Sequence, residues 1–288
     1  MKEKNSGGKT LRELLKVQEI LVAPGAYDAL TAKMIASLGF KAAYVGGAST
    51  SYGALGLPDI GFIGLADMVQ QIERLRKTVN IPLICDADTG YGNEINVIHT
   101  VEEYENAGAS AIQIEDQKFP KRCGHLQGKE VIPANEMVSK VKAAVSSRKD
   151  SLIIARTDAL SVSGLDDAIS RANSYIDAGA DIAFVESPKN IDDLAVIGKK
   201  VKGFKIANMV EGGKTPILSA KRLKQLGFHI VIYPASAVRA GAKSILEMLS
   251  ALKSTGSTLE YSQSMLSFDE LQELLGLPKI LEKGKKFA

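Results

Sequence analysis

The chain has 288 residues, of which 45% are hydrophobic and 24% charged, and its formal net charge is +3. This composition is ordinary for a globular protein, and the small, scattered excess of basic residues gives no argument for a nucleic-acid or membrane partner. The first ten residues lack the apolar segment of a signal peptide, and no apolar run approaches the ~20 residues of a membrane span. We therefore expect a cytoplasmic protein, in which the two cysteines stay reduced.

Short apolar runs rich in β-branched residues alternate along the chain with longer stretches of helical period. A weak first strand is expected within 20–30. Clearer strands are expected at 42–47, 82–88, 111–116, 152–159, 182–187, 205–210 and 230–234. Helices are expected between them, and the clearest patterns cover 64–79, 96–108, 135–148 and 165–180.

This alternation favours parallel strands with right-handed crossovers, either in a closed barrel or in an open doubly wound sheet. An open sheet usually carries a glycine-rich phosphate loop after its first strand, and no G-x-G-x-x-G occurs in the chain. We predict an α/β fold, a (β/α)8 TIM-type barrel, as one domain over 1–288. The barrel core is expected at about 10–245 and a C-terminal helical segment at about 246–288.

Polar side chains end nearly every expected strand. They are Asp86, Asp88, Glu115, Asp116, Arg156, Asp158, Glu186 and Asn208. In a barrel the carboxyl ends of the strands converge on one mouth, where the active sites of this architecture lie. Each residue alone could equally be a helix cap or a loop polar group, but the repetition from strand to strand favours a shared site.

The motif DADTGYG gives the sharpest electrostatic signal. Asp86 and Asp88 are separated by one residue, so on an extended strand their carboxylates lie on the same side and repel each other unless a proton or cation intervenes. Oxygen ligands without a His/Cys cage favour Mg²⁺ or Mn²⁺ over Zn²⁺, and Glu115 could complete the shell directly or through water. Such D-x-D pairs also cap helices and bind surface Ca²⁺.

Cys123 stands out by its position. Two basic residues precede it and favour the thiolate, and Gly124 follows it and lets the loop move. His125 could tune the proton affinity of the thiol or cap the loop. Cys85, by contrast, lies inside an apolar run and reads as a core residue. A chance cysteine on a surface loop is the alternative for Cys123.

Further groups in the sequence suit an acidic substrate. Gly46 and Gly47 end a strand, where backbone N–H groups could hold a carboxylate or phosphate. Arg156 and Arg239 are candidate carboxylate forks, although either could form an internal salt bridge instead. Together these residues indicate a metal-dependent site for a small acid, with a mobile thiol.

Seven motifs resemble those of the isocitrate lyase/phosphoenolpyruvate mutase superfamily in order and spacing. They are GLPD (56–59), DADTGYG (86–92), IEDQ (114–117), KRCGH (121–125), ARTDA (155–159), VES (185–187) and NMVEGGKTP (208–216). A basic-flanked CGH after IEDQ is similar to the carbon–carbon lyase branch, and members that rearrange phosphonates generally look different in this loop.

The resemblance implies a modified eight-fold barrel whose last helix exchanges with a neighbouring subunit in a homotetramer. It implies Mg²⁺, held directly or through waters by Asp86 and Asp88 and supported by Asp59 and Glu115. Cys123 would be the acid that protonates the carbanion.

The resemblance also implies the substrate contacts. They are Gly46, Gly47, Ala48, Gly124, Arg156, Glu186, Asn208 and Arg239. Related lyases often begin the backbone stretch at Gly46 with serine. The acceptor of the substrate's hydroxyl proton is not identified by the motifs, and Tyr44 is a candidate.

Departures from the family pattern bear on the substrate. Lyases of 2-methylisocitrate tend to read PEA where this chain has VES, and TEFG where it has VEGG (210–213). They typically carry an arginine where this chain has Phe268, and burying a third carboxylate against phenylalanine would be costly. The resemblance therefore implies a small alkyl-substituted 2-hydroxy dicarboxylate such as 2,3-dimethylmalate, cleaved to pyruvate and propanoate.

Several alternatives stay open. One is 2-methylisocitrate cleavage to pyruvate and succinate, with an arginine from a neighbouring subunit. The others are an oxaloacetate-cleaving hydrolase, phosphonomutase or carboxyphosphonoenolpyruvate chemistry, and a non-catalytic barrel that only binds a metal and an acid.

Overall fold

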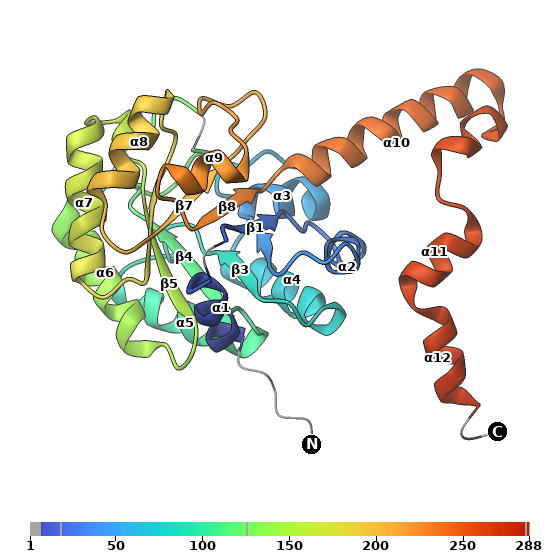
Figure 1. The fold of residues 1–288 in the computed structure, drawn as a ribbon, viewed down its shortest axis with the longest axis horizontal. Coiled ribbons are helices and arrows are strands. Elements are labelled where there is room, and N and C mark those ends of the chain that lie inside the picture. Colours follow the sequence, from blue (N-terminus) through green and yellow to red (C-terminus); the bar gives the residue numbers. More distant parts are fainter. Residues whose placement is uncertain (1–6, 18, 125, 286, 288) are drawn as a thin grey trace.

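The computed structural model describes residues 7–17, 19–124, 126–285 and 287. Eight parallel strands form a nearly closed barrel surrounded by helices, which confirms the expected (β/α)8 fold (Figure 1). The strands are β1 (Leu21–Pro24), β2 (Ala43–Val45), β3 (Leu83–Asp86), β4 (Ala111–Glu115), β5 (Leu152–Thr157), β6 (Ile182–Val185), β7 (Phe204–Asn208) and β8 (Ile230–Tyr233).

The helices follow the strands in the expected alternation. They are α1 (Gly7–Leu15), α2 (Ala29–Ser37), α3 (Gly47–Thr50), α4 (Leu65–Thr78), α5 (Glu94–Ala107), α6 (Ala134–Ser147), α7 (Leu165–Asp177), α8 (Ile191–Lys200), α9 (Ala220–Gln225), α10 (Ser236–Thr255), α11 (Phe268–Leu275) and α12 (Leu277–Gly284). Short turns η1 (Ser51–Leu55), η2 (Ala159–Ser161) and η3 (Leu259–Ser264) complete the set. None of these described helices is both long and apolar enough to cross a membrane.

The strands pair in the order β1-β8-β7-β6-β5-β4-β3-β2, and every paired ladder is parallel. A single bridge between Gly25 and Tyr44 joins the two ends of this order, and Ala26 N–H donates to Tyr44 O at 2.8 Å. The weak first strand is therefore real, although it pairs with β2 through this bridge alone.

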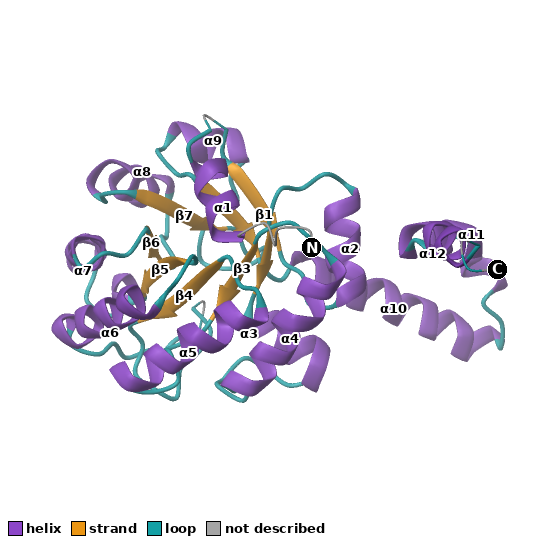
Figure 2. Ribbon diagram, turned by 90° about the horizontal axis from the view of Figure 1, so that it is seen from below, coloured by secondary structure: helices purple, strands orange, loops and turns teal. Residues whose placement is uncertain are grey.

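Apolar side chains close the amino-terminal end of the barrel. Figure 2 looks from that end and shows α1 lying across the ring of strands. Leu11 and Leu15 of α1 pack in one cluster with inward-facing strand residues such as Ile84 and Ile154. The outer faces of the strands are buried under the helices, as parallel strands require. Polar groups that must reach solvent or ligand therefore lie at the carboxyl ends.

The C-terminal segment extends beside the barrel (Figure 1). Helices α10, α11 and α12 contain no buried residue. Large apolar side chains stay exposed along this arm, among them Ile245, Leu246, Leu249, Leu259, Leu266, Phe268, Ile280 and Leu281. The arm touches its own barrel where Lys33 Nζ of α2 donates to Leu275 O at 2.5 Å. An apolar surface of this extent is typical of a protein–protein contact.

Candidate active site

The two aspartates of DADTGYG lie at the carboxyl end of β3, but the strand itself ends at Asp86. Asp88 has a positive φ of 47°, in the left-handed region, and its N–H donates to Asp86 Oδ1 at 3.2 Å. The expectation that strand alternation aligns the two carboxylates is therefore wrong. A turn aligns them instead, closed by Gly90 N–H donating to Ala87 O at 2.8 Å.

The stretch GGAST lies beside these aspartates, and its conformation differs from the expected strand end. Instead of a free strand end, Gly47 begins the single turn α3 directly after β2, and Ala48 is half-buried. Gly47 N–H donates to Asp86 Oδ2 at 3.2 Å, so one of the amides predicted to bind substrate is engaged by a carboxylate. A Cβ on Gly47 would lie 3.3 Å from Asp88 Oδ1, which shows how closely the backbone approaches the pair.

Asp86 is held by a polar residue that the sequence did not single out. Gln113 Nε2 on β4 donates to Asp86 Oδ1 at 2.9 Å, and Tyr44 Oη donates to Gln113 Oε1 at 3.1 Å. Burial, with a smaller contribution from Asp86, raises the pKa of Tyr44 well above its ordinary value of 10. The Tyr44 phenol stays protonated here, which does not suit it to accept a substrate's hydroxyl proton.

The loop between β4 and α6 carries Cys123 over the mouth. It folds back on itself at a bridge between Gln117 and Val131. Lys121 Nζ, buried at the tip, pairs with Asp59 and lies 2.9 Å from Asp88 Oδ1. Cys123, two residues farther on, is half-buried. The loop thus reaches the acidic residues predicted to bind metal.

The surroundings of the thiol add a residue that sequence reasoning missed. Burial raises the pKa of Tyr52, on η1, above its ordinary value, and the neighbouring Cys123 and Asp59 raise it further. Tyr52 therefore lies close to the thiol and the acid cluster. Neither Cys85 nor Cys123 forms a disulfide. His125, proposed to tune the thiol or cap the loop, lies outside the described residues.

Arg156, at the end of β5, is enclosed by carboxylates from three strands. Its Nε lies 2.9 Å from Asp158 Oδ2 and 3.3 Å from Glu115 Oε2, and its Nη1 lies 3.6 Å from Glu186 Oε2. Burial alone would lower the pKa of Arg156, but Asp158, Glu115 and Glu186 raise it well above its ordinary value. Asn208 Nδ2 donates to Glu186 Oε2 at 3.1 Å. The structure thus brings five of the predicted strand-end residues into one network.

Gly124 joins the loop to this network. A Cβ on Gly124 would lie 2.6 Å from Arg156 Nη2 and 2.7 Å from Glu186 Cγ, so no other residue fits without displacing a side chain. Along the chain, Cys123 lies between Lys121, which contacts the aspartates, and Gly124, which borders Arg156.

Charge at the mouth is strongly unbalanced. Among the described residues at the mouth, buried carboxylates outnumber buried cations. The carboxylates are Asp59, Asp86, Asp88, Glu115, Asp158 and Glu186, and the cations are Lys121, Lys129 and Arg156. Burial raises the pKa of Glu115 well above its ordinary value and that of Asp88 to about 7. Glu115 Oε1 is buried and has no hydrogen-bond partner in the described chain. These uncompensated oxygens fit a hard divalent cation.

The donor set also indicates which cation fits. In the described part of the chain, no three His, Cys, Asp or Glu side chains form a metal shell by themselves. A site with two direct carboxylate ligands suits Mg²⁺, which typically keeps several of its waters. Zn²⁺ prefers nitrogen and sulfur donors, which this cluster lacks.

Two predicted residues lie outside the buried network. Arg239 on α10 is 54% exposed, and its Nη1 lies 3.6 Å from Glu211 Oε2, which is the salt bridge within the chain that the sequence left open. The same Nη1 donates to the backbone oxygen of Glu211 at 2.6 Å. Phe268 begins α11 and is 77% exposed, on an arm that lies beside the barrel rather than over its mouth (Figure 1). In a single chain Phe268 therefore does not line the candidate site.

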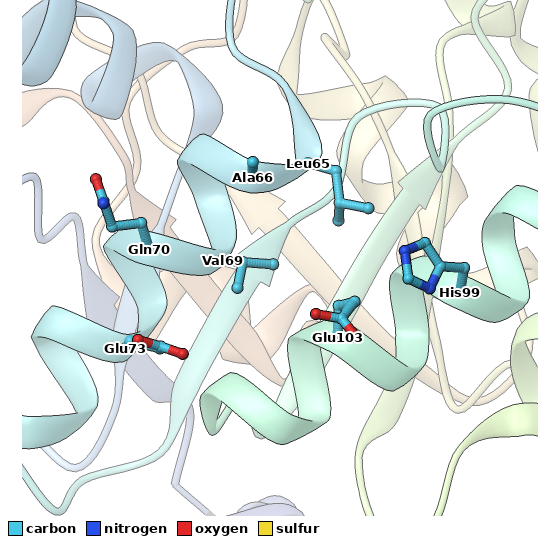
Figure 3. A pocket seen from close by; sticks show the side chains of 7 residues that line it. All are labelled: Leu65, Ala66, Val69, Gln70, Glu73, His99 and Glu103. Carbon is cyan, nitrogen blue, oxygen red and sulfur yellow. The ribbon is translucent and has the colours of Figure 1, made fainter.

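A separate groove lies on the outer helical layer, between α4 and α5 (Figure 3). It has a volume of about 450 Å³ and is lined by Leu65, Ala66, Val69, Gln70, Glu73, His99 and Glu103. None of the mouth residues borders it, so the chemistry of the candidate site does not depend on this groove.

Comparison with known proteins gives one consistent family. The family profile described as phosphoenolpyruvate phosphomutase matches residues 11–253. The chain is 44% identical to a 2,3-dimethylmalate lyase of Eubacterium barkeri, over 96% of this chain and 97% of that protein. It is 42% identical to a 2-methylisocitrate lyase of Aeropyrum pernix, over 93% of this chain and 87% of that protein.

Solved structures agree in fold. Oxaloacetate acetylhydrolase in complex with 3,3-difluorooxalacetate superposes with a TM-score of 0.92 at 34% identity, covering 98% of this chain and 97% of that one. Phosphonopyruvate hydrolase in complex with oxalate and Mg²⁺ superposes with a TM-score of 0.86 at 30% identity, covering 96% and 97%.

Proposed function

Because the chain belongs to the phosphoenolpyruvate mutase/isocitrate lyase superfamily and is a carbon–carbon lyase, we propose that it cleaves an alkyl-substituted 2-hydroxy dicarboxylate of the 2,3-dimethylmalate type. The products are pyruvate and propanoate. The observation that carries the proposal is the placement of the Cys123 loop, which contacts Asp88 through Lys121 and Arg156 through Gly124.

The reaction balances with one proton lost to solvent and one gained from it. The C2–C3 bond breaks, the C2 hydroxyl loses its proton to solvent as the 2-oxo group forms, and C3 keeps the electron pair and takes a proton from a donor that solvent then reprotonates. Cys123 is the proposed donor of that proton, as a general acid. The closed loop limits the access of water to C3, so the proton comes from the thiol.

Asp86 and Asp88 are the proposed ligands of Mg²⁺, with Asp59 and Glu115 in support, and Mn²⁺ suits the same oxygen donors. When bound, the cation supplies a Lewis acid that stabilises negative charge developing on the substrate oxygens. The excess of buried carboxylates at the mouth supports this assignment.

The remaining predicted residues orient the substrate. Arg156 presents paired N–H donors that match a carboxylate, and Asn208 Oδ1 is buried without a hydrogen-bond partner in the described chain, so it is available to accept one from substrate. Glu186 positions both groups through its contacts. The backbone at 46–48 borders the same space.

We also propose a cytoplasmic homotetramer in which the C-terminal helices exchange between subunits. The absence of buried residues from α10, α11 and α12 supports the exchange, and a catalytic thiol supports a reducing compartment. Only an exchanged arm would carry Phe268 to a mouth. The preference for a dicarboxylate that was argued from Phe268 therefore depends on this assembly.

Cleavage of 2-methylisocitrate is the second candidate, favoured by the 42% identical relative. The test is a steady-state assay of the purified protein with Mg²⁺ on 2,3-dimethylmalate, 2-methylisocitrate, isocitrate, oxaloacetate and phosphonopyruvate, with each product identified. We expect kcat/KM to be highest for 2,3-dimethylmalate, with equal amounts of pyruvate and propanoate. A higher kcat/KM for 2-methylisocitrate would overturn the substrate, and turnover of phosphonopyruvate alone would overturn the reaction class.

A further inference from the structure

Lys129 lies on the returning side of the Cys123 loop, and its ammonium is buried. The side chain is 2% exposed, and Nζ lies 2.6 Å from Asp158 Oδ1. The same Nζ donates to Gly124 O at 2.6 Å. Since Gly124 follows Cys123 directly, Lys129 fixes the loop backbone next to the residue that carries the thiol.

Ser187 holds the same carbonyl from the barrel side. Its Oγ lies 2.9 Å from Gly124 O and 2.9 Å from Glu186 Oε1, and its single hydroxyl proton serves one of them at a time. Ser187 is 1% exposed and has a positive φ of 59°. Residues other than Gly, Asn and Asp seldom adopt this backbone conformation. The strained backbone aims the hydroxyl at the loop.

The Gly124 carbonyl therefore accepts hydrogen bonds that link the loop to two strand ends. Lys129 connects it to Asp158 after β5, and Ser187 connects it to the end of β6. A buried hydrogen bond to a charged donor stabilises more than a neutral one, so Lys129 contributes the larger share.

We propose that Lys129 and Ser187 are positioning residues that keep the Cys123 loop closed over the mouth by holding the Gly124 carbonyl. The inference rests on the proposed function, because it gives loop closure a part in that reaction. It adds that closure is linked to Arg156, since Asp158 accepts hydrogen bonds from both Lys129 and Arg156. The proposal also gives a role to Ser187, the serine of the VES motif at 185–187.

The test compares three variants of the full-length protein with saturating Mg²⁺ and no substrate. Lys129→Met removes the ammonium and keeps the aliphatic stem, and Ser187→Gly removes the hydroxyl while suiting the positive φ. Lys118→Met is the matched control, because Lys118 is an exposed lysine of the same loop. Its Nζ lies 3.2 Å from Oε2 of Glu130, which is exposed as well.

The readout is the rate at which iodoacetamide alkylates Cys123, measured by mass spectrometry. We expect about a tenfold faster rate for Lys129→Met, equivalent to about 1.4 kcal/mol less stable closure, and a smaller increase for Ser187→Gly. Cys85 is fully buried and serves as the internal control for unfolding. Lys118→Met should match the wild type.

Turnover is measured separately on 2,3-dimethylmalate. A lower kcat in step with faster alkylation supports the proposal. A lower kcat with unchanged alkylation in Lys129→Met and Ser187→Gly overturns it, since Lys129 would then act on Arg156 without closing the loop. Alkylation of Cys85 marks an unfolded variant, and Ser187→Gly then decides alone. The alkylation result stands whether or not 2,3-dimethylmalate proves to be the substrate.

Discussion

Lys121 Nζ lies 2.9 Å from Asp88 Oδ1, and both side chains are almost fully buried. The loop that carries Cys123 thus places a positive charge directly among the carboxylates proposed to bind Mg²⁺. Burial raises the pKa of Asp88 to about 7, and Lys121 opposes that rise. The contact ties the thiol, two residues away, to the acidic end of the mouth.

Replacing Lys121 should strengthen metal binding. A buried ammonium opposes the binding of a second cation to the same carboxylates, so Lys121→Met should lower the Kd for Mg²⁺ several-fold. Isothermal titration calorimetry of the two proteins measures this directly. Lys118→Met, which removes an exposed lysine from the same loop, should leave the Kd unchanged; weaker binding by Lys121→Met would show that the Lys121 ammonium does not compete for the metal site.

Removing a proposed ligand should abolish the response to metal. At a Mg²⁺ concentration 100 times its Kd, the free energy of unfolding of the wild type should rise by about 2.7 kcal/mol. Asp88→Asn should lose this increase together with turnover. Asp177→Asn is the control, since Asp177 forms an exposed pair with Lys202. If Mg²⁺ stabilises Asp88→Asn as much as the wild type, the ligands have been misassigned.

His229 should make stability depend on pH. Burial, followed by Lys205 and Lys224, lowers the pKa of His229 to about 4, and its neutral Nδ1 accepts Lys205 N–H at 3.2 Å. The pKa of His229 in the folded protein is below the unfolded value of about 6.5, so folding favours the neutral imidazole. The stability that the neutral imidazole contributes is fully present above pH 6.5 and is lost as pH falls through 4. Urea unfolding between these pH values should show a shallower pH dependence for His229→Gln; an identical slope would assign the effect to other groups.

The exposed arm should mediate assembly. Leu246 and Leu249 on α10 are 65% and 48% exposed. Exposed apolar side chains that lie together in this way are typical of a surface that a second protein chain covers. Changing both to Asp should convert the proposed tetramer to smaller species in analytical ultracentrifugation. Changing the exposed Lys243 of the same helix to Asp is the matched charge control and should leave the sedimentation of the wild type unchanged. If the wild type sediments as a monomer, the proposed exchange of C-terminal helices between subunits is wrong.

The strand-end residues could be predicted because barrel topology alone brings carboxyl ends together. Glu115, Arg156, Glu186 and Asn208 meet as the alternation implied, and Asp86 lies on β3 beside β4, the strand of Glu115. Asp88 joins them by a different route, since its positive φ belongs to a turn that side-chain periodicity does not encode. The sequence therefore predicted the right neighbours with the wrong local geometry.

The residues that sequence reasoning missed act through distant contacts. Lys129 meets Asp158 across 29 positions, and Ser187 meets Gly124 across 63. Gln113 is a polar residue inside the apolar strand β4, and its amide donates to Asp86 Oδ1. A polar residue inside a buried run was the available signal for Gln113, whereas none marked Lys129.

Turnover of Cys123→Ser tests most directly whether Cys123 is the proton donor. With 2,3-dimethylmalate and Mg²⁺, kcat should fall by about 10²–10⁴-fold, the usual contribution of a positioned general acid, because serine is a far weaker acid. Mg²⁺ binding and the unfolding transition should match the wild type, and Cys85→Ala, which removes the buried thiol, should retain kcat. Near wild-type turnover by Cys123→Ser would contradict the proposed chemistry.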